Sequence, residues 1–249
     1  MKYARGDRSH LVPAHDRLDG APLTASPAQR RLSAAVLGGA WHHDDVPYYG
    51  LDIETDTTVD GLDPARSSVV AVAVTAPFGE EVLTGEEPGL LRSLDELVVA
   101  LPPGVLVTWN GASFDLPFLA ERSRRCGVPL ALRLVEDTSG PTRRPGSLPG
   151  HPNPYRAAWG PHRHLDGYRL YRADVGRTLG LPCGLKPMAR LVGLAPVEVD
   201  RAAIHSLTPD ELHEYVASDA RIARELVMRR MPAAARFADT VPAPMGLDR

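Results

Sequence analysis

The sequence contains few cysteines, almost no lysine and no long apolar run, and each shortage excludes a class of protein or site. Its 249 residues include 2 cysteines, too few for a disulfide framework or a cysteine-rich zinc site. No segment approaches the 18 or so apolar residues of a membrane-spanning helix, and the start of the chain lacks the apolar core of a signal peptide. We therefore expect a chain that does not bind membranes and works in a reducing, cytoplasmic setting.

The charge and size of the chain are those of a globular protein. A formal net charge of −3 excludes a wholly basic nucleic-acid binder, although it allows a local basic groove. Lys2 and Lys186 are the only lysines, and because genome composition can produce such an arginine bias, arginine abundance by itself indicates no function. The length and punctuation predict an N-terminal arm (1–45), one domain (46–232) and a C-terminal tail (233–249).

Hydrophobic patterning predicts an α/β domain with a mixed central sheet flanked by helices. Val-rich segments predict strands at 48–54, 67–76, 80–85 and 105–109. A helix is expected from residue 87, ended by Pro102 and Pro103, and a second from a Ser113 cap to Arg125, closed by Gly127. Further helical patterns follow Asp166 and cover 184–193.

The segment from 136 to 164 has no clear pattern and is interpreted as an insertion rich in Arg, Pro and Gly. Arginines with interleaved aromatic residues are typical of a groove for single-stranded nucleic acid. The candidate groove residues are Arg143, Arg144, Tyr155, Arg156, Trp159 and Arg163. A plain flexible insertion would explain the same composition.

The last helix has the clearest signals. Thr208 is expected to cap it, Pro209 takes the first position, Glu211 completes a capping box, and Pro232 ends the run.

Within "YYGLDIETD" (48–56), Asp52 and Glu54 alternate with apolar Leu51 and Ile53. In a strand, the two carboxylates share one face with their Cα atoms about 6.6 Å apart. Two such charges 4 Å apart repel by about 4 kcal/mol at an effective dielectric constant of 20. Either water solvates the pair or a cation lies between the carboxylates.

Strand and helix geometry predicts that three more residues lie near Asp52 and Glu54. Asp115 comes just after the expected strand 105–109, and open α/β sheets bind ligands at the carboxyl ends of their strands. Tyr215 and Asp219 are four residues apart in the last helix and share a face. Each residue alone is ordinary.

In order, "DIET" (52–55), "WNGASFD" (109–115) and "YVASD" (215–219) resemble the three exonuclease motifs of the DEDD superfamily of 3′–5′ exonucleases. The closest likeness is to the proofreading domains of family B DNA polymerases and their stand-alone relatives. "GLKPMARLVGL" (184–194) also resembles the segment that precedes the third motif. The resemblance spans about 48–230 and implies an RNase H-like fold.

One residue near the last acid separates the branches of this superfamily. The DEDDh branch has a His five positions before the final Asp, where this chain has Glu214, and the DEDDy branch has a Tyr four positions before it, where this chain has Tyr215. His213 fits neither branch and is expected on the surface. The chain resembles the DEDDy branch.

The resemblance also implies a division of roles. Asp52, Glu54 and Asp219 would hold one of two Mg²⁺ or Mn²⁺ ions, Asp52 would bridge to the second ion, and Asp115 would support that second ion. Tyr215 would orient the attacking water. Carboxylate oxygens suit these hard cations.

Candidate substrate contacts are Ile53, Thr55, Asn110 and Phe114. Asn110 could bond the terminal nucleotide or only end its strand, and Phe114 could stack on a base or pack at the start of its helix. Asp166 resembles an acid found in this region of related exonucleases, although capping a helix would also explain it.

The leading functional hypothesis is a metal-dependent 3′–5′ exonuclease acting on single-stranded or frayed nucleic acid, DNA rather than RNA. An exoribonuclease that trims RNA would carry the same motifs, and an inactive RNase H-like module that binds nucleic acid or protein is the alternative from another class. No polymerase motif accompanies the acids, so a polymerase or helicase partner would be a separate, unknown chain.

Overall fold

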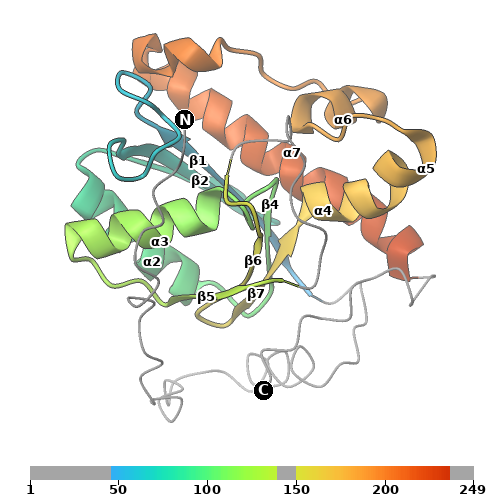
Figure 1. The fold of residues 1–249 in the computed structure, drawn as a ribbon, viewed down its shortest axis with the longest axis horizontal. Coiled ribbons are helices and arrows are strands. Elements are labelled where there is room, and N and C mark those ends of the chain that lie inside the picture. The colour runs from blue at the N-terminus through green and yellow to red at the C-terminus, as the bar shows by residue number, and fades with distance from the viewer. Residues whose placement is uncertain (1–45, 139–149, 236–249) are drawn as a thin grey trace.

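The computed structural model describes residues 46–138 and 150–235, in which a seven-stranded mixed sheet lies between layers of helices (Figure 1). The strand order is β3-β2-β1-β4-β7-β6-β5. The strands are β1 (Tyr48–Thr55), β2 (Val69–Ala76), β3 (Gly79–Thr84), β4 (Val105–Thr108), β5 (Leu132–Glu136), β6 (Tyr155–Trp159) and β7 (His162–Asp166). The predicted α/β class with a mixed sheet is confirmed.

The centre of the sheet is parallel and its two sides are antiparallel. β1 pairs in parallel with β4, and β4 pairs in parallel with β7. β2 and β3 continue the sheet antiparallel beyond β1, and β6 and β5 do so beyond β7. The carboxyl ends of β1, β4 and β7 therefore meet at one edge of the sheet.

The interpretation of 136–164 as an insertion without regular structure is wrong for its second half. Residues 155–159 and 162–166 form β6 and β7, and β7 completes the parallel centre of the sheet. Arg156 and Arg163 belong to these strands, and Trp159 is fully buried. Arg143 and Arg144 lie outside the described residues. Backbone pairing with β4 and β5 organises strands whose arginine and histidine side chains obscure the apolar pattern.

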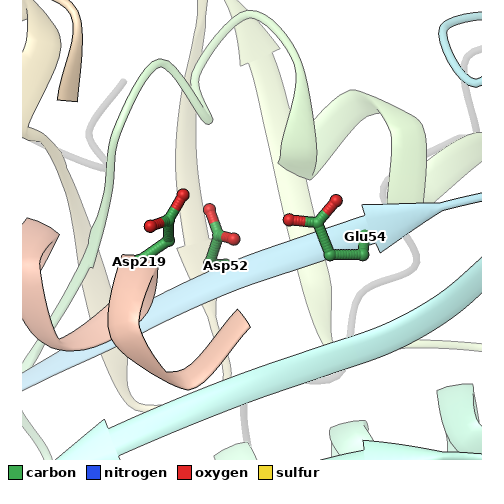
Figure 2. Close-up of side chains that lie close together, drawn as sticks. All are labelled: Asp52, Glu54 and Asp219. Atoms are coloured by element: carbon green, nitrogen blue, oxygen red, sulfur yellow. The ribbon is translucent and has the colours of Figure 1, made fainter. Parts of the chain in front are cut away.

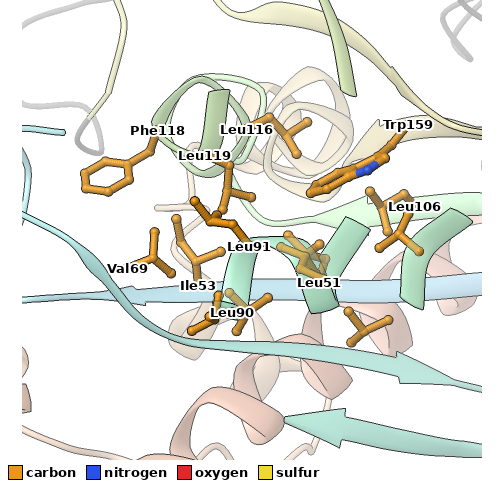
Figure 3. Close-up of a cluster of buried hydrophobic side chains, with 14 of the residues drawn as sticks. Leu51, Ile53, Val69, Leu90, Leu91, Leu106, Leu116, Phe118, Leu119 and Trp159 are labelled. Carbon is orange, nitrogen blue, oxygen red and sulfur yellow. The ribbon is translucent and has the colours of Figure 1, made fainter. Parts of the chain in front are cut away.

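Opposite faces of the sheet bury different residues of β1. Tyr49, Leu51 and Ile53 face α2 (Glu87–Ala100) and α3 (Asp115–Cys126), where they join the apolar core drawn in Figure 3. On the other face α7 (Pro209–Ala235) crosses β1 and β2. Here the contact is made by short side chains, which allow a close approach of helix and sheet: Ala71, Ala73, Val216, Ala217 and Ala220.

The remaining helical segments connect β7 to α7. They are α4 (Gly167–Tyr171), the π-helical turn η2 (Arg172–Gly176), α5 (Arg177–Leu179), α6 (Leu185–Leu191) and the 3₁₀ helix η3 (Arg201–Ser206). Within residues 46–138 and 150–235, no helix is both long enough and apolar enough to cross a membrane.

Helix ends agree with the sequence at two places and differ at two. Thr208 and Glu211 form the capping box, each bonding the other's backbone N–H, and Gly127 ends α3 in the left-handed conformation with φ 63°. Ser113 is not the cap of α3. That position belongs to Phe114, whose side chain makes no capping bond. α7 runs past position 232 to Ala235, so Pro232 does not end it.

Candidate functional site

Three carboxylates from two elements meet beside the carboxyl end of β1. Asp52, Glu54 and Asp219 each offer one oxygen, and these oxygens all lie within 4.8 Å of one another. Figure 2 shows Asp52 and Glu54 rising from β1 beside Asp219 of α7. The pleat of β1 places the first two on one face, and the close approach of α7 brings the third. We call these three residues the acidic cluster.

The surroundings of the acidic cluster make its charge unfavourable without a cation. Glu54 and Asp219 are buried, and Asp52 is partly exposed. Burial, followed by repulsion from Asp219, raises the pKa of Asp52 well above its ordinary value and that of Glu54 to about 8. Burial also raises the pKa of Asp219. A divalent ion bound between these three carboxyl groups would favour their ionised forms and offset their mutual repulsion. The carboxylate oxygens present therefore fit Mg²⁺ or Mn²⁺.

Asp115 lies next to the acidic cluster at the first position of α3. Its charge contributes to the raised pKa of Asp52 and of Glu54. Burial raises its own pKa to about 7, while hydrogen bonds from its own backbone N–H and from that of Ile53 oppose the shift. The bond from Ile53 ties Asp115 to β1.

The turn that carries Asp115 is held by Asp166 from the end of β7. The Asp166 carboxylate accepts hydrogen bonds from the backbone N–H groups of Asn110 (3.0 Å) and Ala112 (3.1 Å). It also accepts one from Arg169 at 3.3 Å, which caps α4, so the capping interpretation is confirmed. Asn110 has φ 73°, and a Cβ on Gly111 would lie 2.3 Å from the Thr108 hydroxyl oxygen. The turn therefore requires glycine at position 111, and its positive φ at position 110 favours asparagine.

Two basic residues that sequence analysis did not select compensate the acidic cluster. The Lys186 ammonium pairs with Asp219, donates to the Val197 carbonyl at 2.5 Å, and lies 4.5 Å from the centre of the Tyr215 ring. The Arg201 guanidinium lies 3.9 Å from the other Asp219 oxygen. Lys186 lies in the "GLKPMARLVGL" segment, which resembles the segment before the third motif. No local signal in the sequence marks Arg201.

Tyr215 lies beside the acidic cluster, one turn before Asp219 in α7. It is 1% exposed, and burial, followed by the charge of Glu54, raises the pKa of its hydroxyl. Arg201 donates a hydrogen bond to the Tyr215 side chain. His213 is exposed on the same helix, as expected, and Glu214 pairs with Arg221 on the surface.

The candidate substrate contacts lie in different environments. Ile53 belongs to the apolar core under α2 and α3, and the Thr55 hydroxyl donates to the Gly61 carbonyl at 2.5 Å. Asn110 is 7% exposed. Phe114 is partly exposed and packs on that core and on Phe118, with ring centres 5.4 Å apart. Substrate contact by any of the four stays a prediction.

No protein-family model matches the chain, but DNA polymerases match parts of it. DNA polymerase 2 of Aeropyrum pernix is 34% identical over 95 residues, which are 36% of this chain and 12% of that protein. The catalytic subunit of DNA polymerase epsilon from Eremothecium gossypii is 28% identical over 156 residues, covering 61% of this chain and 6% of that protein. The chain thus spans a small part of the relatives that it matches.

A solved structure extends the likeness to most of the described fold. The family B DNA polymerase from the hyperthermophilic archaeon Pyrobaculum calidifontis superposes with a TM-score of 0.61 and 24% sequence identity, covering 81% of this chain and 26% of that one. At this identity the superposition shows the fold, and the RNase H-like fold expected from the motifs is confirmed. The sequence relatives named above are DNA polymerases, and most of the length of this chain shares the fold of one part of a family B DNA polymerase.

Proposed function

We propose that the chain is a metal-dependent 3′–5′ exonuclease that removes nucleotides from the 3′ end of single-stranded or frayed DNA. The observation that carries the proposal is the acidic cluster, in which β1 and α7 bring three carboxylate oxygens within 4.8 Å of one another beside Tyr215. In the part of the chain that the structure describes, every acid named by the three motifs is at or next to this place.

The ions expected are Mg²⁺ or Mn²⁺, two per site. Asp52, Glu54 and Asp219 would hold one ion, with Asp52 shared by a second ion that Asp115 supports. When bound, such ions supply an activated water and compensate the charge that develops on the phosphate and on the departing oxygen. The raised pKa values of Asp52, Glu54 and Asp115 support this assignment, because a divalent charge would favour their ionised forms.

A side chain of the protein orients the attacking water. The Tyr215 hydroxyl, kept protonated by its raised pKa, orients the attacking water through a hydrogen bond. The water oxygen bonds to phosphorus and loses a proton to solvent. The bond from phosphorus to the 3′ oxygen of the preceding nucleotide breaks, and that oxygen takes up a proton from solvent. The products are a nucleoside 5′-monophosphate and a strand shortened by one nucleotide, with a free 3′ hydroxyl.

DNA is favoured over RNA because the proteins similar to this chain are named DNA polymerases. The acidic cluster itself would act on either polymer, since the proposed reaction takes place at phosphorus and RNA and DNA differ at the sugar 2′ position.

The direct test uses 5′-labelled DNA and RNA strands of one sequence, incubated with the protein in Mg²⁺, in Mn²⁺ or in EDTA. We expect a descending ladder on single-stranded DNA with either ion and none in EDTA. A ladder on RNA alone would establish the exoribonuclease alternative. Binding without cleavage under every condition would establish the inactive module and contradict the proposal.

A further inference from the structure

Arg201 reaches the acidic cluster from η3, which is fastened to the end of the acid-bearing strand. Ile204 is buried beneath η3. Thr57, two residues beyond β1, shares a hydrogen bond of 2.9 Å between its hydroxyl and the Nδ1 atom of His205, and also accepts from the His205 backbone N–H at 3.4 Å. These contacts fix the backbone of Arg201 beside Asp52 and Glu54.

The Arg201 guanidinium touches the groups expected to act on the scissile bond. It donates a hydrogen bond to Tyr215 and lies 3.9 Å from an Asp219 oxygen. That separation exceeds the 2.7–2.9 Å or so of a charge-assisted hydrogen bond, so the pairing with Asp219 is loose. Its side chain is 64% exposed, so solvent reaches this side chain beside the acidic cluster.

Lys186 differs in each of these respects. Its side chain is 11% exposed, it pairs closely with Asp219, and it donates to the carbonyl of Val197 while lying over the ring of Tyr215. The ammonium has three donors, and its partners Asp219, Val197 and Tyr215 all belong to the protein. Of these two cations at Asp219, Arg201 has the more exposed side chain and is therefore the more accessible to a ligand that arrives from solvent.

We propose that Arg201 is a catalytic residue that binds a non-bridging oxygen of the scissile phosphate while its bond to Tyr215 holds the hydroxyl that orients the water. This inference rests on the proposed exonuclease function. A guanidinium fork matches two phosphate oxygens. Negative charge on those oxygens must be compensated during attack, and a donor already in place does so without reorganisation. Cations on Asp219 would release the guanidinium from its loose contact, so that Arg201 and the phosphate become partners.

The test compares Arg201→Ala and Arg201→Lys with a matched control, Arg124→Ala. Arg124 is 57% exposed and ion-paired with Glu121 on α3. Two quantities are measured: the Mn²⁺ dependence of the melting temperature, which reports metal affinity, and the single-turnover cleavage rate of a 5′-labelled DNA strand at saturating Mn²⁺. Arg201→Ala should bind Mn²⁺ more tightly, because a competing positive charge is removed. Its rate should nevertheless fall on the order of 10- to 100-fold, as expected for one charge-assisted bond.

Arg201→Lys should recover part of the rate, because the charge remains and the fork is lost, and Arg124→Ala should change neither quantity. Opposite signs in the two measurements separate this role from a structural one, because a distorted site would weaken metal binding and cleavage together. Weakened metal binding in Arg201→Ala, or an unchanged rate beside an active parent, would overturn the inference and leave the exonuclease proposal standing. A parent chain that binds Mn²⁺ but cleaves nothing would overturn both.

Discussion

Gly50 of β1 lies directly against Ala220 of α7: a Cβ atom on Gly50 would come within 2.2 Å of the Ala220 carbonyl oxygen. Asp52 is two residues after Gly50, and Asp219 immediately precedes Ala220. The absence of one side chain therefore determines how closely the two halves of the acidic cluster approach.

Gly50→Ala should force α7 away from β1, because neither backbone can yield without shifting its element. We expect a loss of about 1–3 kcal/mol in the free energy of unfolding and a weaker stabilisation by Mn²⁺, both measured by urea denaturation with and without the ion. Gly89→Ala is the matched control. A Cβ there meets no described atom within 4 Å, and alanine in the first turn of α2 should be neutral or stabilising by up to about 1 kcal/mol. Parental behaviour of Gly50→Ala would show that the contact does not set the site.

Divalent ions should stabilise the folded chain. A ligand of the folded state at 100 times its Kd adds about 2.7 kcal/mol, which corresponds to a rise of several degrees in Tm for a domain of this size. Asp52→Asn should remove most of this response, since we propose that both ions share Asp52. Glu96→Gln, an exposed change on α2, should leave it intact. The check is thermal unfolding in Mn²⁺, Mg²⁺ and EDTA, and an identical response in Asp52→Asn would contradict the ligand assignment.

In EDTA, stability should fall as pH rises toward 8. Glu54 has a folded pKa of about 8, above its ordinary 4.5, so between these values the folded protein binds more protons than the unfolded chain. That contribution is complete below about pH 4.5 and is lost as pH increases through the folded pKa, by at most about 1.4 kcal/mol per pH unit for one carboxyl group.

Glu54→Gln should remove this slope, so its stability relative to the parent should grow from pH 5 to pH 8. Taking the difference cancels the contribution of His164, whose pKa burial lowers to about 3. Glu96→Gln provides the control, and urea denaturation at each pH provides the free energies. If the unfolding free energies of the parent and of Glu54→Gln change in parallel with pH, the pKa of Glu54 is not raised in the metal-free protein.

Lys186→Met should destabilise the metal-free protein by about 3–5 kcal/mol, because Asp219 would remain buried without its close partner. Adding Asp219→Asn to Lys186→Met should restore part of that loss, since the uncompensated charge disappears. A double-mutant cycle by urea denaturation in EDTA measures the coupling. Additive effects of the two changes would mean that the Lys186–Asp219 ion pair contributes no coupling.

Local patterns predicted the elements that carry the motifs. β1, β2 and α7 have continuous or capped apolar periodicity, and the resemblance then identified Asp52, Glu54 and Asp219, which the structure brings together. β6 and β7 were missed because pairing with distant strands organises them.

The contacts of Lys186 and Arg201 with Asp219, and of Asp166 with the turn at 110–112, join residues distant in sequence. No periodicity or spacing marks such contacts in a single sequence. They follow only from the packing of α6, η3 and β7 around the acidic cluster.

Single-turnover cleavage of a 5′-labelled DNA strand in Mg²⁺, by the parent and three variants, tests the exonuclease proposal most directly. Asp219→Asn removes a proposed metal ligand and should cost the most activity. Tyr215→Phe keeps the buried ring but loses the hydroxyl proposed to orient the water, and should lower the rate roughly 10- to 150-fold with little change in affinity for the strand. His213→Ala, at an exposed position of the same helix, should be near silent. Cleavage that survives Asp219→Asn and Tyr215→Phe unchanged, or that His213→Ala alone abolishes, would contradict the account.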